Sequence, residues 1–323
     1  MSAVADIFAL LNAVTLAALR NVVVLAAIFT LLPIFFRDCN KTPAWWRKPD
    51  LSTDLCWTIV PNIINRMAQT LLLVFGIIVC YGIVDPTKIG NFLAESHGPF
   101  AGLRFWPQVM LYLLGSDLVL YFTHRLFHRE MLWRFHAVHH SSRHLEWISA
   151  TRFHPVDTIL HGSLADVVML LLGISPDVLI WIVPFNVGSS AMVHANLDWS
   201  FGPFRYVFAS PVFHRWHHTS PALGGSSNFA GTFAFFDVVF GTFYMPADRL
   251  PDAYGLNDPD FPVDFAGQVV NPFVPHANRA ARVEGRPRQR LDEPAPFNLD
   301  RDRKPEPERT VLATEQPPAG AKR

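Results

Sequence analysis

Three short clusters of histidine stand out in this sequence of 323 residues. They read HRLFH at 124–128, HAVHH at 136–140 and HRWHH at 214–218, and they hold eight of the 14 histidines. Residues three or four apart on a helix project from one face, so each cluster would present its imidazoles side by side. Imidazole is the commonest side-chain metal ligand, and sites of nitrogen alone suit iron, zinc, copper or nickel. Eight imidazoles exceed what one octahedral ion can hold, so the spacing predicts a pair of metals.

The composition indicates a membrane protein. Half of the residues are hydrophobic and 17% are charged, whereas soluble chains carry about a quarter charged residues. Lipid-facing helices have few places for charge, which explains such a deficit. The formal net charge is zero, so no overall field recruits nucleic acid as a partner. The three cysteines, Cys39, Cys56 and Cys80, show neither metal-ligand spacing nor an even count for a disulfide framework.

Long apolar segments position the clusters along the chain. A helix of about 20 residues crosses the hydrocarbon core of a bilayer. The apolar segments that qualify are 6–36, 55–84, 103–122 and 160–193. Pro61 would break the second segment, and Pro176 would divide the fourth into two helices packed as a re-entrant hairpin, because proline interrupts a helix. We therefore expect an all-α polytopic membrane protein with about four transmembrane helices.

Charge places the clusters relative to the membrane. The basic loop at 37–54 and the five arginines between 125 and 152 would share one side, and the loop at 85–100 would lie on the other. Loops on the cytoplasmic side of a membrane are enriched in Lys and Arg. The sequence therefore predicts an integral, multi-pass membrane protein whose histidine-rich helical cap and active site face the cytoplasm.

Composition divides the chain into three parts. Residues 1–102 would form an N-terminal transmembrane region, 103–250 would form the domain that carries the histidines, and 251–323 would be a C-terminal extension. From about residue 276 Arg, Pro, Glu and Asp dominate and periodic apolar residues vanish. Such a segment cannot bury enough surface to offset its ordering entropy, so we expect disorder from about residue 280.

The order and intervals of the clusters resemble the fatty acid hydroxylase/sterol desaturase superfamily, with the bacterial-type sterol desaturases among its members. Its pattern is HxxxH, HxxHH, a later single histidine and a final HxxHH, and the single histidine here is His194 in MVHANLDW. Asp117 and Tyr121 before the first cluster, HHSS after the second, and FHPVD at 153–157 extend the resemblance. SSNFAGTFAFFDVVFGTF at 226–243 is similar to the closing segment of the family. The resemblance covers roughly residues 105–246 and makes 103–250 the catalytic domain.

The resemblance implies a non-haem diiron centre that uses O₂ to oxidise C–H bonds of a fatty-acyl, sterol or other isoprenoid-like membrane lipid. Carried over by position, the metal ligands are His124, His128, His136, His139, His140, His194, His214, His217 and His218. Some members of the family carry another histidine where this chain has Ser190. That position would be an open coordination site, or would be completed by water, His154 or His161.

Several further residues are expected to support the ligands rather than bind metal. Metal-bound histidines need a carboxylate or carbonyl partner, so we expect His154 to act beside the ligands and His161 to pack within a helix. Asp117, near the end of an apolar helix, is expected to orient a cluster histidine. Asp157 and Asp237 would either do the same or cap helices.

The chemistry of C–H bonds agrees with a redox-active metal. An unactivated C–H bond has no acidic proton, so general-base catalysis cannot break it. Iron and oxygen together can remove the hydrogen atom, whereas zinc has no redox chemistry. Zinc can still substitute for iron in purified protein, because ligand softness does not exclude it. Return of a hydroxyl group gives an alcohol and a second hydrogen abstraction gives an alkene, so hydroxylation and desaturation both stay open.

The partners follow from the same reading. No cytochrome or flavin module is visible in the sequence, so electrons would come from a separate donor, a reductase with ferredoxin or cytochrome. The alternative function is a metal-binding or metal-transport membrane protein without oxidase activity. Transport requires polar ligands along a path through several spans. Here the clusters follow the ends of apolar segments, which favours an enzyme.

Overall fold

The computed structural model describes residues 2–94, 96–247 and 249–274, and these residues contain helices and loops but no β-strand. The α-helices are α1 (Ser2–Phe35), α2 (Leu51–Ile59), α3 (Pro61–Tyr81), α4 (Pro86–Ala94), α5 (Phe105–Phe127), α6 (Glu130–His136), α7 (Pro155–Asp157), α8 (Leu164–Leu171), α9 (Pro176–His194), α10 (Pro211–His217), α11 (Phe235–Val239) and α12 (Phe265–Val270). Shorter turns of 3-10 helix are Trp45–Arg47, His139–Ser141, Trp147–Thr151, Gly202–Tyr206, Pro221–Leu223 and Asn271–Phe273, and Thr158–Ser163 is π-helical. The all-α expectation is confirmed. The tail expected to be disordered from about residue 280 lies outside the described residues.

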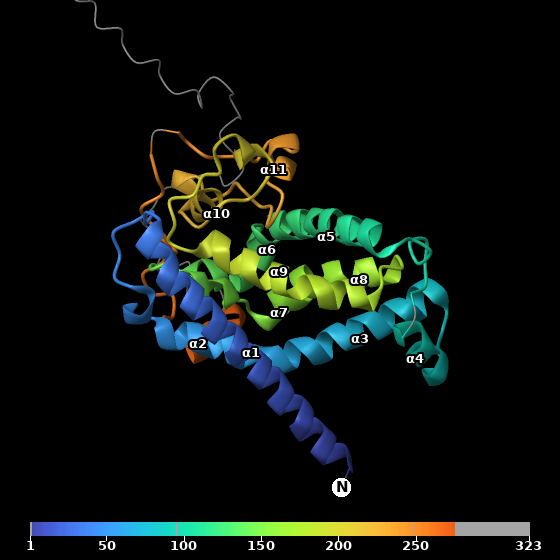
Figure 1. The fold of residues 1–323 in the computed structure, drawn as a ribbon. Coiled ribbons are helices and arrows are strands. Elements are labelled where there is room, and N and C mark those ends of the chain that lie inside the picture. Colours follow the sequence, from blue (N-terminus) through green and yellow to red (C-terminus); the bar gives the residue numbers. More distant parts are fainter. Residues whose placement is uncertain (1, 95, 248, 275–323) are drawn as a thin grey trace, which may run out of the picture.

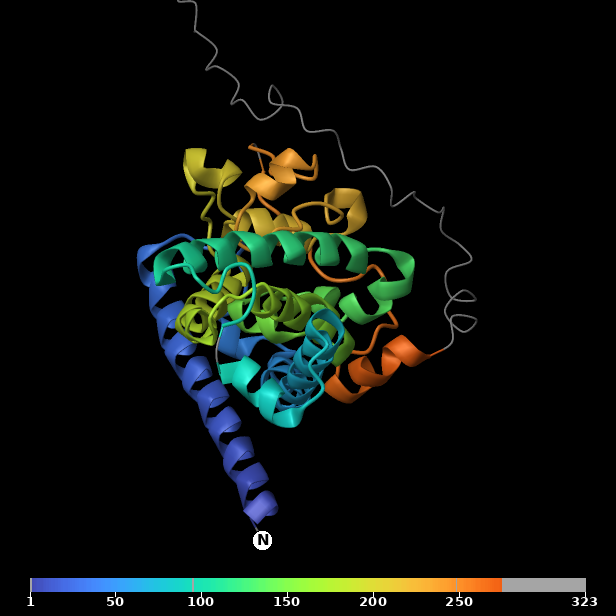
Figure 2. The ribbon, with the colours of Figure 1, turned by 90° about the vertical axis from the view of Figure 1, so that its right-hand side faces the viewer.

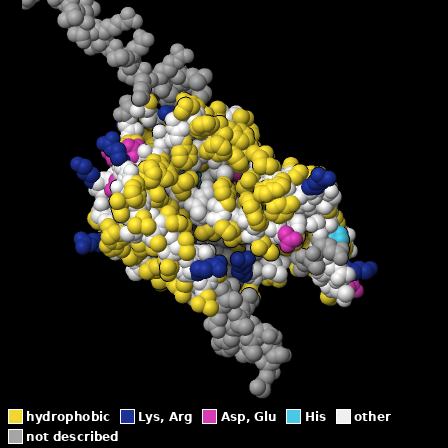
Figure 3. Space-filling model, viewed as in Figure 1, with side chains coloured by type: hydrophobic (Ala, Val, Ile, Leu, Met, Phe, Trp, Pro, Cys, Tyr) yellow, Lys and Arg dark blue, Asp and Glu magenta, His cyan; other side chains and the backbone are white. Residues whose placement is uncertain are grey.

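Four helical stretches are long and apolar enough to cross a membrane. They are Leu16–Phe35 in α1, Leu51–Tyr81 across α2 and α3, Phe105–Phe127 in α5 and Pro176–His194 in α9. Many of their apolar side chains are exposed, among them Ile34, Phe35 and Leu71. Figure 3 shows one face dominated by hydrophobic side chains with scattered Lys and Arg. Hydrocarbon accommodates such a surface, so the chain is an integral membrane protein, as the sequence predicts.

Proline divides two of the apolar segments. Pro61 and Pro176 each occupy the first position of a helix, where the missing N–H costs nothing. The Oγ of Ser175 caps α9 by accepting the N–H of Asp177 at 3.2 Å. Between α8 and α9 the chain turns at Gly173, which has φ of 96° and no room for a Cβ beside the backbone of Ala101. Both breaks are confirmed, but α9 is long enough to span by itself, so the hairpin is not formed by two half-length helices.

Packing of α5 against α8 and α9 aligns the two helices that carry histidines at their ends. Val109 and Tyr112 of α5 share an apolar cluster with Met169 of α8 and with Val178 and Ile182 of α9. The N-terminal halves of α5 and α9 therefore lie together, and the two helices run in the same direction. Their C-terminal ends reach the same place, where α6 and α10 also lie (Figure 1).

The C-terminal half of α1 joins this end of the molecule through aromatic packing. Phe29 stacks on Trp147 with ring centroids 5.6 Å apart, and Trp45 meets Trp147 edge-on at 5.0 Å. The indole N–H of Trp45 donates to the hydroxyl of Thr30 at 3.1 Å. The N-terminal half of α1 projects past the other helices in both views (Figure 1, Figure 2). The first span is thus tied to the histidine-bearing region at its C-terminal end.

Candidate metal centre

The nine histidines predicted from the sequence come together in two groups. Within each group, one nitrogen of every ring lies within 4.8 Å of the corresponding nitrogens of the others. The first group, called the group of five, contains His124, His128, His136, His140 and His217. The second, called the group of four, contains His139, His194, His214 and His218. Their service as metal ligands stays a prediction, but no predicted ligand lies apart from the rest.

The ends of α5 and α9 supply three of the nine histidines. His124 lies in the last turn of α5, and His128 is its C-terminal cap residue. His194 is the last residue of α9. Side chains four apart share one face of a helix, so His124 and His128 both reach the group of five. The parallel packing of α5 and α9 brings these two ends, which are far apart in sequence, to one site.

The second and third clusters contribute to both groups. His136 ends α6, and His139 and His140 follow in a 3-10 turn. The rings of His136 and His140 enter the group of five, whereas His139 enters the group of four. The third cluster divides in the opposite sense, because His217 joins the group of five and its two companions join the group of four. One short helix therefore serves both groups in each case.

Main-chain carbonyls fix two rings of the group of five. The Nδ1 atom of His124 lies 2.7 Å from the carbonyl oxygen of Phe229, and Nδ1 of His217 lies 2.7 Å from that of Ser227. A carbonyl oxygen only accepts, so each Nδ1 must carry the proton. The Nε2 of each ring then holds a lone pair directed into the group. Metal-bound histidines characteristically have such a partner on the other ring nitrogen.

Two further rings are held in the same way. The Nδ1 of His194 lies 2.7 Å from the carbonyl oxygen of Ser190, one helical turn earlier. The Nδ1 of His136 lies 2.7 Å from Oδ2 of Asp157, and both side chains are buried. The position where some relatives of this pattern carry a histidine, Ser190, thus contributes its carbonyl to His194.

The contacts inside the group of four fit a cation better than a set of hydrogen bonds. Nε2 of His194 lies 3.1 Å from Nε2 of both His214 and His218, and 3.2 Å from Nε2 of His139. The Nε2 atoms of His214 and His218 are themselves 3.1 Å apart. Because Nε2 of His194 can only accept, both of these neighbours would have to donate to it, and they would then oppose each other N–H to N–H. No set of neutral tautomers satisfies all three contacts, whereas a metal ion among the lone pairs does.

The group of five also contains buried nitrogens without a hydrogen-bond partner, which fits a metal ion there as well. The buried Nε2 atoms of His128, His140 and His217 have no hydrogen-bond partner among the described residues. Leaving a buried polar atom unsatisfied costs about 1–3 kcal/mol. Nε2 of His124 faces Nε2 of His136 at 3.0 Å. The residues present therefore fit metal ions in both groups.

Burial keeps these imidazoles neutral. It lowers the pKa of His128, His139 and His140 well below the usual value, and neighbouring histidines lower it further. Burial lowers the pKa of His217 to about 3, and the hydrogen bond to the carbonyl of Ser227 acts in the opposite direction. A neutral ring has a lone pair available for a metal without first losing a proton. At neutral pH these four rings therefore each have a lone pair available for a metal ion.

The expected role of Asp117 was wrong. Its carboxylate contacts no histidine and instead accepts the backbone N–H groups of Gly231, Thr232 and Phe233 at 3.1, 3.0 and 2.7 Å. The loop at 229–233 is not helical, so its N–H groups need an outside acceptor. Asp117 therefore anchors the loop whose Phe229 carbonyl holds His124.

Of the other two aspartates, only Asp157 contacts a cluster histidine, His136. Burial raises the pKa of Asp157 to about 7. Asp237 accepts the N–H groups of Phe229 and Ala230 at 2.8 Å each and the hydroxyl of Thr242 at 2.6 Å. Asp237 thus acts through the loop and not on a ring.

The two histidines considered for a tenth ligand lie outside both groups. Nε2 of His154 lies 3.3 Å from the carbonyl oxygen of Val269, and its ring packs beside Phe135. His161 bonds the hydroxyl of Thr123 at 2.7 Å, and its ring centroid is 5.3 Å from that of His124. His161 therefore packs within a helical turn, as expected, with its ring beside His124. The ring of His154 lies against Phe135, and no hydrogen bond or ring contact joins it to a cluster histidine among the described residues. His276 lies outside the described residues.

Arg215, within the third cluster, was missed by sequence reasoning. Its guanidinium is fully buried and donates to the carbonyls of Leu145 at 2.9 Å and His194 at 3.1 Å. It also donates to Oδ1 of Asn40 at 2.7 Å and to the hydroxyl of Tyr254 at 3.0 Å. One side chain thus fastens the third cluster to the end of α9 and to the segment that follows the second cluster.

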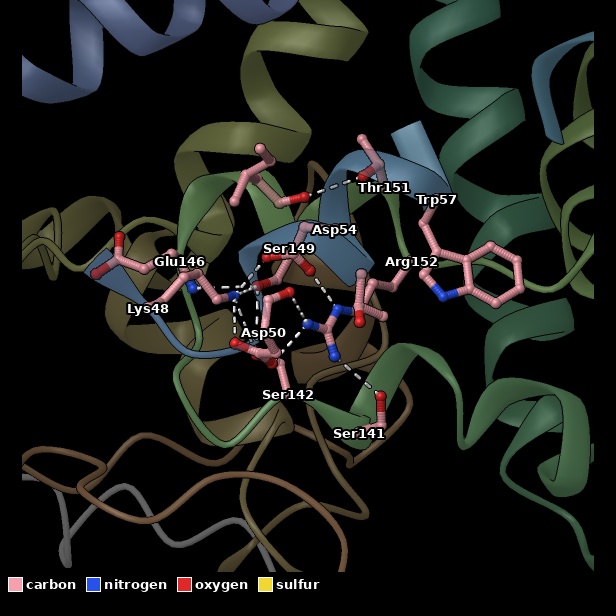
Figure 4. Close-up of polar contacts among 12 residues, drawn as sticks. Lys48, Asp50, Asp54, Trp57, Ser141, Ser142, Glu146, Ser149, Thr151 and Arg152 are labelled. Carbon is pink, nitrogen blue, oxygen red and sulfur yellow. Dashed lines mark hydrogen bonds and ion pairs between the residues drawn. The ribbon is translucent and has the colours of Figure 1, made fainter. Parts of the chain in front are cut away.

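A buried ion network behind the second cluster was also missed. Its charged members, called the ion quartet, are Lys48, Asp50, Asp54 and Arg152 (Figure 4). Asp54 is fully buried and bonds Lys48 at 2.5 Å as well as the Nε of Arg152. The quartet donates to the two serines after His140, with Arg152 on Ser141 at 3.2 Å and Lys48 on Ser142 at 3.3 Å. It links α2 to the end of the second cluster.

Comparison with known proteins agrees with this geometry. Residues 109–242, which include all nine histidines, match the family model described as fatty acid hydroxylase. Over these residues the chain is similar to the fatty acid hydroxylases. It is 34% identical over 178 residues to ornithine lipid hydroxylase OlsE of Rhizobium tropici, covering 53% of this chain and 54% of that protein. The resemblance inferred from the sequence is confirmed.

Other similar proteins are named for different lipids. An alkylglycerol monooxygenase of Danio rerio is 31% identical over 150 residues, covering 46% of this chain and 33% of that protein. Methylsterol monooxygenase 2-2 of Arabidopsis thaliana is 28% identical over 141 residues, covering 42% of this chain and 52% of that protein. The chain spans about half or less of the length of these relatives. No solved structure matches it.

Proposed function

We propose that this protein is a membrane-bound, oxygen-dependent lipid oxidase with a histidine-ligated diiron centre. The observation that carries the proposal is the group of four, whose converging Nε2 atoms cannot all be satisfied by hydrogen bonds. The proposed ligands are His124, His128, His136, His140 and His217 for one ion, and His139, His194, His214 and His218 for the other. Two buried groups of this size fit a pair of ions.

The metals would supply the one-electron oxygen chemistry that removes hydrogen from an unactivated C–H bond. The chain's own residues would hold and orient them. The carbonyls of Phe229, Ser227 and Ser190 and the carboxylate of Asp157 fix four rings with Nε2 inward. Burial excludes water from the site. Zinc, which binds the same donors, would occupy the site without supporting oxidation.

The proposed substrate is a membrane lipid. Three relatives are named for an ornithine lipid, an alkylglycerol and a methylsterol, and all three are named hydroxylases or monooxygenases. These names favour hydroxylation over desaturation for this chain. Both groups lie at the ends of spanning helices α5 and α9, so a lipid would reach them from the bilayer without leaving it.

We further propose that the site faces the cytoplasm, because basic residues gather around it. A separate reductase with ferredoxin or cytochrome would deliver electrons there. The catalytic domain would occupy 103–250, between the N-terminal spans of 1–102 and the extension of 251–323. Metal transport is not favoured, because the histidines gather at the ends of spans and do not follow a path through them.

The test combines metal analysis with product analysis. Full-length protein purified with iron should contain about two iron ions per chain, and replacement of iron by zinc should abolish turnover. Membranes containing the protein would be supplied with ¹⁸O₂ and their lipids analysed by mass. Label in a new hydroxyl group identifies a hydroxylase, and an unlabelled alkene identifies a desaturase. Binding of metal without any lipid product would support the metal-binding alternative instead.

A further inference from the structure

A cavity of about 200 Å³ opens where α9 ends. Its walls come from the end of α1, the loop at 38–46 and residues 195–197, which directly follow His194 at the end of α9. The carboxylates of Asp38 and Glu146 and the aromatic rings of Phe29, Trp45 and Trp46 line it. A ligand held here would thus lie within a few residues of a proposed metal ligand.

Glu146 brings a negative charge to the cavity that no cation in the described chain neutralises by direct contact. The residue is 8% exposed, and its carboxylate accepts the backbone N–H of Ser149. The nearby cation Lys48 is paired with the aspartates of the ion quartet. Figure 4 shows the carboxylate of Glu146 turned away from those four charged side chains.

The protonation of Glu146 agrees with a missing positive partner. Burial raises its pKa to about 7, although the charges of Arg215 and Lys48 oppose this. Burial also raises the pKa of Asp38. The guanidinium of Arg215 donates its hydrogen bonds to neutral acceptors. A cation in the cavity would let both carboxylates ionise at low cost.

The aromatic wall is ordered and accessible. Trp45 is fixed by its hydrogen bond to Thr30 and by edge-on contact with Trp147. Trp46 meets Trp45 edge-on at 5.7 Å and is 49% exposed. The faces of tryptophan and phenylalanine attract ammonium groups, and tryptophan is enriched where protein meets the bilayer surface. Carboxylates and aromatic faces together are the donors that recognise an organic ammonium ion.

We propose that this cavity binds the ammonium group of a membrane lipid headgroup and so holds that lipid next to the group of four. The proposal rests on the proposed function and narrows its substrate class to lipids that carry a primary or quaternary amine. Glu146 and Asp38 supply the negative charge, and Trp45 and Trp46 supply the aromatic faces. Placement beside residues 195–197 puts the headgroup at the end of α9, with the bilayer along α1 and α9 available for the tails.

Binding can be measured without turnover. Full-length protein, purified with its metals in a detergent with an uncharged sugar headgroup, would be titrated with dodecylammonium and followed by equilibrium dialysis. Dodecylammonium should bind, and Glu146→Gln should raise its Kd by about tenfold or more, as expected when one partner of a buried charge contact is removed. Trp46→Ala, at a half-exposed position, should raise Kd severalfold. Asp85→Asn, in the exposed loop before α4, is the matched control and should leave Kd unchanged.

Other ligands distinguish a lipid headgroup from a soluble amine as the source of the bound ammonium group. Dodecanol and dodecyl sulfate share the tail and should bind at least tenfold more weakly. Ethylammonium lacks the tail, and if it binds as tightly as dodecylammonium the site is one for soluble amines and the lipid assignment is overturned. Equal binding of dodecylammonium to the parent, Glu146→Gln and Trp46→Ala proteins overturns the whole proposal. Selective binding in a protein that oxidises no lipid would instead count against the proposed oxidase alone.

Discussion

The guanidinium of Arg215 donates to the main-chain carbonyl of His194 at 3.1 Å, and it does so from within the third histidine cluster. His194 belongs to the group of four, and so does His214, which precedes Arg215 in the sequence. The same guanidinium reaches the carbonyl of Leu145. A single buried fork of N–H donors therefore sets the spacing between three segments that are distant in the sequence.

Replacing Arg215 with lysine should loosen the group of four. Lysine keeps the charge but has a single donor head in place of the planar fork that serves four acceptors. We expect lipid oxidation to fall about 10–100-fold and metal content to drop towards one ion per chain, in line with changes to groups that orient metal ligands. Metal analysis and product yield check this, with the exposed Arg104→Lys as control. Unchanged metal content would show that Arg215 does not position the site.

Alanine at His139 or His217 removes one proposed ligand, from a different group in each case. Both variants should lose lipid oxidation while still entering the membrane, because the apolar spans are untouched. His97→Ala and deletion of residues 280–323 should keep turnover within a few-fold of the parent. Product analysis and membrane fractionation decide the outcome. Full activity in either cluster variant contradicts the diiron proposal.

The ion quartet should matter for stability. Asp54 is fully buried and contacts both cations of the quartet, so Asp54→Asn leaves two buried cations facing one carboxylate. Breaking a buried pair in this way costs about 3–5 kcal/mol, and we expect a clear fall in melting temperature. Asp50→Asn, at a side chain that is 17% exposed, should cost less. If both variants have the same melting temperature as the parent, the quartet contributes no net stability.

Glu146 should give the protein a pH-dependent stability. Burial raises its folded-state pKa from 4.5 to about 7. The folded state therefore holds the proton more tightly than the unfolded state. The stabilisation from this group is fully present below about pH 4.5 and is lost as the pH rises through about 7.

Glu146→Gln removes this dependence because glutamine stays neutral. Relative to the parent, the variant should gain stability between pH 6 and pH 8, by up to about 3 kcal/mol from a shift of this size. Melting temperatures measured across that range provide the test, with Asp85→Asn as the control. Parallel melting curves for the parent and Glu146→Gln proteins would show that the carboxyl group does not titrate there.

The features of the fold and the site that could be predicted from the sequence are those that depend on residues close together in the chain. Apolar length predicted the spans, and Pro61 and Pro176 predicted the two breaks, because proline restricts the backbone wherever it occurs. Histidine spacing, together with the family resemblance, predicted all nine members of the two groups. Each of these signals is confined to one stretch of chain.

Features that depend on distant segments were not predictable. The carbonyl of Phe229 holds His124 across 105 positions of sequence, and a main-chain acceptor leaves no trace in residue type. Arg152 meets Asp54 across 98 positions. Asp117 was expected to orient a histidine because it is an ionisable residue near the end of an apolar helix, yet its carboxylate accepts loop N–H groups more than a hundred residues later. Contacts of this kind follow from the packing of whole helices.

The division of each HxxHH cluster between the two groups has a consequence for assembly of the centre. His139 lies beside His140 in one short turn, yet the two rings serve different groups, and α10 is shared in the same way by His214 and His217. An ion bound in one group would immobilise turns that the other group also needs, and the ordering entropy would then already be spent. Loading of the first ion should therefore make loading of the second easier, so that partially filled protein is scarce at every iron concentration.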